Sequence, residues 1–167
     1  MRLVPNLLPA ILITLIAQFS CYADTRPQII GTSAPVFLLP DSNGKLHSLK
    51  RWNNKLIIVN FWATWCAPCK KEIPLFNDIQ REFDDEIQFV GIAIDNAKDV
   101  KIFNKNIPLN YPNLIGGLDA IELVQQYGNK TGTLPYTVFI NRTGKILMTA
   151  SGKVTRRFLQ RTIEKLL

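Results

Sequence analysis

The chain has 167 residues, of which 47% are hydrophobic, and its 20 lysines and arginines against 13 acidic residues give a formal charge of +7. This length fits one domain with a sizeable core, and the two cysteines that follow residue 23 are too few for a small exported domain held together by disulfides. The basic residues are scattered and form no stripe interleaved with aromatic residues, which argues against nucleic acid as a partner.

The first 23 residues have the pattern of a signal peptide. Arg2 provides a short positive end, residues 7–17 form an uncharged apolar run, and Cys21-Tyr22-Ala23 has small residues at the two positions that a signal peptidase reads. We expect cleavage after Ala23 and therefore a periplasmic or otherwise exported protein.

Two other fates of this segment stay open. The chain could keep it as a membrane anchor through residues 7–19, although the apolar run is shorter than the roughly twenty residues of a usual span. Cys21 could instead become a lipidated N-terminus, although the aliphatic residue expected three positions earlier is missing.

Residues 24–33 predict a flexible lead-in, and residues 34–167 a single domain. The domain opens with an N-terminal β-hairpin, in which a short strand at 34–40 is followed by a turn at 41–44 and a returning strand at 45–49. His47 falls on the polar side of the alternation in the second strand, so we expect it at the surface.

Residues 55–61 contain four consecutive aliphatic residues and predict a strand buried on both faces, as in a mostly parallel sheet. Beyond the next eight residues, apolar side chains at 73, 76, 79 and 83 have helical spacing. The segment Cys66-Ala67-Pro68-Cys69 lies between the two. Cys66 is therefore expected at a helix N-terminus.

That position favours the thiolate form of Cys66, because unpaired N–H groups and the positive end of the helix dipole stabilise negative charge. Lys70 and Lys71 add to the effect. Cys66 is then the expected nucleophile, and Cys69, one turn further on, is the shielded partner that attacks a mixed disulfide. Pro68 in the first turn costs no hydrogen bond.

The alternatives for a Cys-x-x-Cys pair are a structural disulfide and half of a zinc site. A bridge over so short a loop would constrain the unfolded chain little. Zinc needs four ligands, and the remaining candidates, Cys21 and His47, form no second pair. We therefore interpret Cys66 and Cys69 as a redox pair, and we predict no metal and no cofactor.

The rest of the chain alternates strands and helices. In order, the patterns predict a strand at 87–94, a helix capped by Asp95 or Asn96 and running to about 106, a short strand at 113–115, a helix at 119–127 ended by Gly128, a hairpin of 136–140 with 145–150, and a helix at 155–167. This order predicts an α/β domain with a central mixed β-sheet flanked by helices.

The eleven residues from Asn60 to Lys70, Asn-Phe-Trp-Ala-Thr-Trp-Cys-Ala-Pro-Cys-Lys, resemble those of thioredoxin-fold proteins, and specifically of the exported TlpA/ResA/DsbE-like thiol:disulfide oxidoreductases. Ala34-Pro35-x-Phe37 with Gly44-Lys45 resembles the N-terminal hairpin of that family. The segment 95–127 resembles its mid-chain insertion. Gly132-Thr133-Leu134-Pro135 falls where the family has its cis-proline loop.

The resemblance implies roles for further residues. Pro135 would be cis and face the disulfide, and Leu134 would present its backbone to a substrate strand. The buried aspartate of thioredoxin is replaced by Asn60, which cannot ionise, and Glu72 stands where ResA-like members have a carboxylate able to exchange a proton with Cys69.

The two tryptophans beside the motif, Trp62 and Trp65, are expected to differ, one lying in the core and one beside Cys66 as an apolar contact surface. We place the substrate contacts at Trp65, Ala67 and Pro68, together with the cis-proline loop. A solvated Glu72 and purely structural tryptophans remain the alternatives.

The implied activity is reduction of disulfides in partner proteins, with a membrane thiol reductase as electron donor. Cytochrome c apoproteins, copper-site assembly proteins and periplasmic oxidoreductases are the candidate substrates. Two other functions stay open. A chaperone could hold Cu(I) between the two thiolates. A peroxiredoxin would need proline at position 59 and threonine at position 63, where this chain has Val59 and Ala63.

Overall fold

The computed structural model describes residues 29–167, so the predicted signal segment and Cys21 lie outside the described part. The elements in chain order are β1 (Leu38–Pro40), β2 (Leu46–Ser48), the 3-10 helix η1 (Leu49–Trp52), β3 (Leu56–Trp62), α1 (Ala67–Glu82), β4 (Ile87–Ala93), α2 (Ala97–Asn106), β5 (Asn113–Ile115), α3 (Ala120–Gln126), β6 (Tyr136–Ile140), β7 (Ile146–Ser151) and α4 (Arg156–Leu166). Within residues 29–167, no helix combines the length and the apolar character needed to cross a membrane.

The main sheet has five strands in the order β5-β4-β3-β6-β7. Strands β3, β4 and β5 run parallel, whereas β6 is antiparallel to β3 and β7 is antiparallel to β6. The predicted mixed sheet is therefore confirmed. Its central strand is β3, which carries the chain directly into the Cys66 motif.

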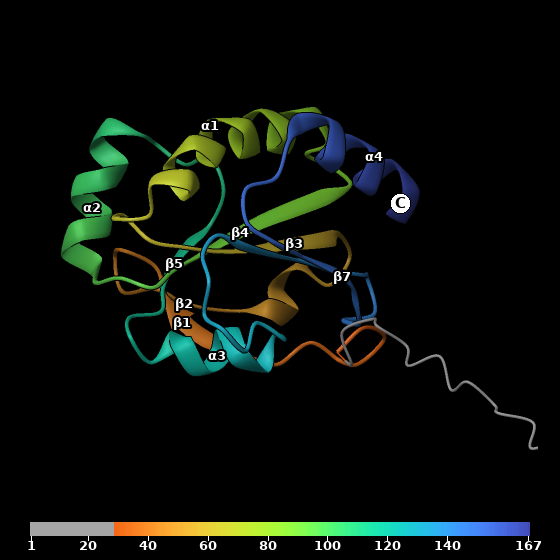
Figure 1. Cartoon of the computed structure of the whole chain (residues 1–167), viewed down its shortest axis with the longest axis horizontal. Coiled ribbons are helices and arrows are strands. Elements are labelled where there is room, and N and C mark those ends of the chain that lie inside the picture. The colour runs from red at the N-terminus through yellow and green to blue at the C-terminus, as the bar shows by residue number, and fades with distance from the viewer. Residues whose placement is uncertain (1–28) are drawn as a thin grey trace, which may run out of the picture.

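Two layers of helix cover the sheet, with α1 and α4 on one face and α3 with the β1–β2 hairpin on the other (Figure 1). Along β3 the side chains alternate between these layers: Ile57, Val59 and Phe61 join the core that includes Tyr127 of the α3 side. Leu56 and Ile58 join the core that holds the α1 and α4 residues. This alternation explains why the whole strand is apolar, because both of its faces are buried.

The N-terminal hairpin is present, but the expected exposure of His47 was wrong. Strand register pairs Leu39 with His47 and Pro40 with Leu46, so His47 shares the inward face with Leu39. Its side chain is 11% exposed, its Nε2 lies 2.9 Å from Asp41 Oδ2, and its ring lies parallel to that of Trp52. The alternation has the opposite phase to the one expected, and Leu46 is the residue that faces solvent.

The described end of the predicted flexible lead-in, residues 29–33, is tied to the sheet. The N–H of Gly31 donates to the carbonyl of Ile146 at 2.7 Å, and the N–H of Ile146 donates to the carbonyl of Thr32 at 2.9 Å. Ser33 forms an antiparallel bridge with Lys145. These residues therefore pair with the start of β7.

The insertion predicted at 95–127 consists of α2, β5 and α3. Strand β5 extends the sheet beyond β4, pairing Gly91 with Asn113. Helix α2 lies beside the end of the sheet at which α1 begins (Figure 1). The insertion therefore supplies one wall around the cysteine motif.

Candidate active site

Cys66 is the N-cap residue of α1, as predicted. After β3 ends at Trp62, the N–H of Cys66 donates to the carbonyl of Ala63 at 3.1 Å and closes a turn. The Sγ of Cys66 accepts a hydrogen bond from the N–H of Cys69 at 3.3 Å, which is the capping contact of the helix. Cys66 sulfur thus lies among the unpaired N–H groups of a helix N-terminus, where negative charge on it is stabilised.

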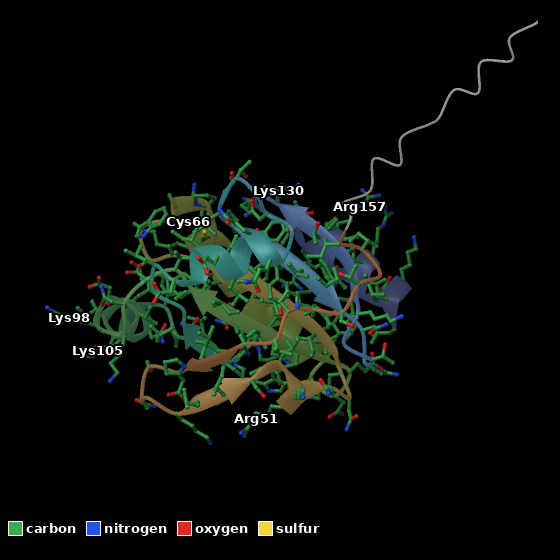
Figure 2. All side chains as sticks on the ribbon, turned by 90° about the horizontal axis from the view of Figure 1, so that it is seen from below. Arg51, Cys66, Lys98, Lys105, Lys130 and Arg157 are labelled. Atoms are coloured by element: carbon green, nitrogen blue, oxygen red, sulfur yellow. A yellow bond between two sulfur atoms is a disulfide. The ribbon has the colours of Figure 1, made fainter. Side chains whose placement is uncertain are left out.

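Cys66 and Cys69 form a disulfide, with 5.3 Å between their Cα atoms. Cys69 is 1% exposed and Cys66 is 5% exposed. Figure 2 shows Cys66 at one edge of the molecule, whereas the labelled Arg51 and Arg157 lie at other edges. The structure is that of the oxidised protein.

The disulfide is packed into a small apolar cluster that draws on four parts of the chain. Trp62 and Ala63 come from the end of β3, Ile73 from α1, Ala93 from the end of β4, and Val100 from α2. Leu134 packs against the same cluster. The peptide bond between Leu134 and Pro135 is cis, as the resemblance implied. The fold therefore brings the predicted cis-proline loop to the cysteines.

The two tryptophans have the different positions expected of them. Trp62 is 1% exposed, its indole N–H donates to Asn113 Oδ1 at 2.9 Å, and its ring contacts that of Phe103 of α2. Trp65, one residue before Cys66, is 68% exposed. Ala67 and Pro68 are exposed next to it.

Asn60 of β3 is buried, and its side-chain amide donates to Thr137 Oγ1 at 3.1 Å. It supplies no ionisable group beneath the disulfide. Among residues 29–167, the buried carboxylate is instead Glu72, which is 1% exposed and lies three residues after Cys69 on the same helix. Residues three apart on a helix are neighbours, with roughly 5–6 Å between their Cβ atoms.

Glu72 is held by the loop between β7 and α4. Its Oε1 accepts a hydrogen bond from the backbone N–H of Val154, and its Oε2 is buried without a partner in the described part of the chain. Burial raises the pKa of Glu72 to about 7, although the Val154 N–H and the charge of Lys153 oppose the rise. Glu72 can therefore both hold and release a proton near neutral pH.

We expect Glu72→Gln to flatten the pH dependence of stability. The folded protein holds the Glu72 proton up to about pH 7, whereas the unfolded chain releases it near 4.5, so wild-type stability falls as pH rises between these values. The slope from this group is at most about 1.4 kcal/mol per pH unit. Denaturant unfolding of the oxidised protein at a series of pH values measures it.

Glu122→Gln is the matched control, because Glu122 is exposed on α3. It should leave the slope unchanged. An equal slope in wild type and in Glu72→Gln would show that Glu72 does not stay protonated in the folded protein.

Sequence reasoning missed two polar contacts around the motif. Asp95 was expected as a possible helix cap, but the cap of α2 is Asn96, and the Asp95 carboxylate contacts Thr64. Asn113 was assigned only to a short strand, yet it holds the indole of Trp62. The signal for Asp95 was its place at the carboxyl end of β4, since parallel neighbouring strands end at the same edge of a sheet.

Within residues 29–167, no three His, Cys, Asp or Glu side chains gather in an arrangement that could hold a metal ion.

A thioredoxin-like sheet that carries a cysteine pair at the N-terminus of its first long helix, opposite a cis-proline loop, defines a thiol:disulfide oxidoreductase. Comparison with known proteins agrees. Residues 30–148 match the model of the AhpC/TSA family, and the chain belongs to that family.

Curated relatives carry the same activity in their names. A thiol-disulfide oxidoreductase ResA of Bacillus cereus is 30% identical over 147 residues, which cover 87% of this chain and 83% of the relative. ResA of Geobacillus thermodenitrificans is 28% identical over 162 residues, covering 96% and 90%.

Among solved structures, a thioredoxin-family thiol:disulfide interchange protein from Chlorobium tepidum TLS has a TM-score of 0.70 and 29% identity. The match covers 86% of this chain and 99% of that one. The resemblance drawn from the cysteine motif is thus confirmed at the level of fold and activity.

Proposed function

We propose that the protein is an exported reductase of disulfides in partner proteins, with Cys66, Cys69 and Glu72 as its catalytic residues. The observation that carries the reductive direction is the burial of Glu72 beside Cys69. A buried carboxylate disfavours a neighbouring thiolate, and a dithiol whose thiolate is poorly stabilised gives up its electrons more readily. Asn60 offers no competing charge.

The proposed reaction has two steps. Cys66 thiolate attacks one sulfur of the partner disulfide, a Cys66–partner disulfide forms, and the other partner sulfur leaves as a thiolate that takes up a proton. Cys69 then passes its proton to the Glu72 carboxylate and attacks Cys66 sulfur, which releases the second partner thiolate. That thiolate takes up a proton from water, and Glu72 returns the proton it accepted to water. The partner gains two electrons and two protons, and the protein is left with the Cys66–Cys69 disulfide.

Partner contacts are proposed at the surface around the disulfide. Trp65, Ala67 and Pro68 form its exposed side, Leu134 supplies backbone to an extended partner segment, and the cis bond to Pro135 sets the course of that loop. Two features support this placement. Trp65 is largely exposed, and Leu134 packs against the cluster that contains both cysteines. Gly152 N–H donates to the carbonyl of Pro135 at 2.8 Å and ties the cis-proline loop to the end of β7.

The setting of this reaction is proposed from the sequence. Residues 1–23 would be removed as a signal peptide, 24–33 would form the lead-in and 34–167 the working domain, in the periplasm or an equivalent exported setting. Retention of residues 7–19 as a membrane anchor is the alternative, and N-terminal sequencing of the expressed protein distinguishes the two. A membrane thiol reductase would supply electrons. Cytochrome c apoproteins and copper-site assembly proteins are the proposed substrates.

The test of direction is the reduction potential, measured by equilibration with glutathione, together with an insulin-reduction assay. We expect a potential nearer that of thioredoxin, about −270 mV, than that of the oxidant DsbA, about −120 mV. We also expect insulin to be reduced. A potential near −120 mV would overturn the reductase assignment while leaving thiol exchange itself intact.

A second candidate function follows from the two thiols themselves, which could hold Cu(I) after reduction. Tight stoichiometric copper binding that Cys66→Ser abolishes, in a protein unable to reduce insulin, would favour a chaperone. Peroxidase activity is the third candidate, because the AhpC/TSA family gives the match. Positions 59 and 63 are Val59 and Ala63, both fully buried. Efficient turnover of hydrogen peroxide without a protein substrate would support it.

A further inference from the structure

The first residue of the insertion contacts the turn that carries Cys66. Asp95 follows β4, and its Oδ2 accepts two hydrogen bonds from Thr64, one from the backbone N–H at 3.1 Å and one from the hydroxyl at 2.5 Å. Its Oδ1 accepts the N–H of Asn96 at 3.0 Å. Both carboxylate oxygens are therefore engaged, and one of them is devoted to a residue two positions before Cys66.

Sheet register explains why these residues meet. Strands β3 and β4 are parallel neighbours, with Trp62 paired to Ala93 at their carboxyl ends. The N–H of Ile94 donates to the carbonyl of Trp62 at 2.8 Å and extends the pairing by one step. Thr64 and Asp95 therefore follow neighbouring strands at the same edge of the sheet. The contact between Thr64 and Asp95 therefore follows from the pairing of two interior strands of the sheet.

Thr64 is the first central residue of the turn that Ala63 and Cys66 close by a hydrogen bond. The backbone N–H and the hydroxyl of Thr64 both donate to Asp95 Oδ2. The turn leads into Trp65, which is exposed, and then to the Cys66 cap of α1. The conformation that presents Cys66 is thus tied to the rest of the protein through Asp95.

The charge of Asp95 is a second feature of the contact. None of the ion pairs among the described residues includes Asp95, so no lysine or arginine there lies within 4 Å of its carboxylate. Its charge is met by three hydrogen-bond donors, and Asp95 itself is half-buried. A carboxylate in this position opposes the accumulation of negative charge on Cys66, against the effect of the helix N-terminus.

We propose that Asp95 is a positioning residue for thiol exchange. It fixes the turn from Ala63 to Cys66 through Thr64, and its negative charge makes the dithiol a stronger reductant. Asp95 touches no reacting atom in this role. The inference rests on the thiol:disulfide exchange activity and not on the direction, partner or location proposed above, so it can fail while those stand.

The test uses the reduced full-length protein and oxidised glutathione as the probe. In this reaction Cys66 thiolate displaces one glutathione thiolate, Cys69 displaces the second, and two electrons pass from the protein to glutathione. The rate of the first step reports the position of Cys66. The equilibrium constant of the whole exchange reports the charge effect.

Asp95→Ala removes both the contact and the charge, and we expect the rate to fall about tenfold because the attacking sulfur is less well oriented. Asp95→Asn keeps an oxygen that can accept the Thr64 hydrogen bonds, and should restore the rate to within about threefold of wild type. Both variants should shift the glutathione equilibrium about threefold toward the protein dithiol, which corresponds to about 14 mV. A rate restored by asparagine, with the equilibrium still shifted, distinguishes the positioning of Cys66 from the effect of the Asp95 charge.

Thr64→Val is the partner variant, because it keeps the backbone N–H and the side-chain shape while it removes the hydroxyl. The double variant Thr64→Val/Asp95→Ala should be no slower than Asp95→Ala within about twofold, since both remove one interaction. Asp119→Ala is the control, because Asp119 is an exposed carboxylate of the insertion whose side chain makes no capping hydrogen bond.

Three outcomes would overturn the proposal. One is a wild-type rate in Asp95→Ala. Another is Asp95→Asn as slow as Asp95→Ala, and the last is an Asp119→Ala shift in the glutathione equilibrium equal to that of the Asp95 variants. Should Asp95→Ala fail to fold, the other two variants still test the proposal. An unchanged glutathione equilibrium in Asp95→Asn contradicts the charge effect, and an unchanged rate in Thr64→Val contradicts the positioning effect.

Discussion

Cys66→Ser should lose disulfide-reductase activity by on the order of 10³-fold or more, because the other cysteine among residues 29–167, Cys69, is almost wholly buried and cannot reach a partner disulfide. Cys69→Ser should behave differently. Its Cys66 can still attack a partner, but the mixed disulfide then lacks the buried thiol that resolves it, so the covalent adduct accumulates. The measurement is insulin reduction for the first variant and non-reducing electrophoresis with mass spectrometry for the second.

The third cysteine of the chain makes a control necessary. Cys21 lies outside the described residues, and it too could form adducts in the full-length protein. The double variant Cys66→Ser/Cys69→Ser keeps Cys21 alone and should trap nothing. Adducts of equal yield in the double variant and in Cys69→Ser would contradict Cys66 as nucleophile, as would trapping by Cys66→Ser in preference to Cys69→Ser.

Trp62→Ala should cost about 3–5 kcal/mol of folding free energy, the range for removing a buried large aromatic side chain. Trp62 is almost wholly buried, its ring centroid lies 4.9 Å from that of Phe103, and its indole N–H satisfies Asn113 Oδ1. Truncation leaves a cavity beneath the disulfide and an amide without its donor. For a chain of this size, the melting temperature should fall by roughly 10 °C or more.

Trp65→Ala is the matched control, since it removes the same side chain three residues later. Trp65 is 68% exposed, so stability should change by no more than about 0.5 kcal/mol. Trp62→Phe should lie between the two, because it keeps most of the packing and loses the hydrogen bond. Equal losses of stability for Trp62→Ala and Trp65→Ala, measured by urea unfolding, would contradict the division of roles between them.

The order of elements was predictable because each buried strand and each amphipathic helix has an apolar pattern of its own. Cys66 at the N-cap of α1 followed from the strand before it and the helical spacing after it. The face of the hairpin on which each side chain lies could not be predicted in the same way. With only three residues per strand, the alternation of apolar residues was too short to decide which face His47 would take. The pairing of His47 with Leu39 between the two strands places His47 on the inward face.

The contacts around the motif were predictable only in part. Glu72 could be singled out by its spacing from Cys69, but its burial depends on Val154, which is 82 residues away in the sequence. Asp95 and Asn113 contact Thr64 and Trp62 through the pairing of separate strands. A hydrogen bond between side chains on different strands leaves no local pattern. Such partners become visible only when strand order and register are known.

The pairing of residues 31–33 with the start of β7 also bears on solubility. Strand β7 is an edge strand of the sheet, and unpaired edges invite pairing with another copy of the chain. The bridge between Ser33 and Lys145 occupies part of that edge with the protein's own backbone. A shortened version of the chain that begins after Ser33 would uncover it and should aggregate more readily, so any truncation for crystallisation should begin before Gly31.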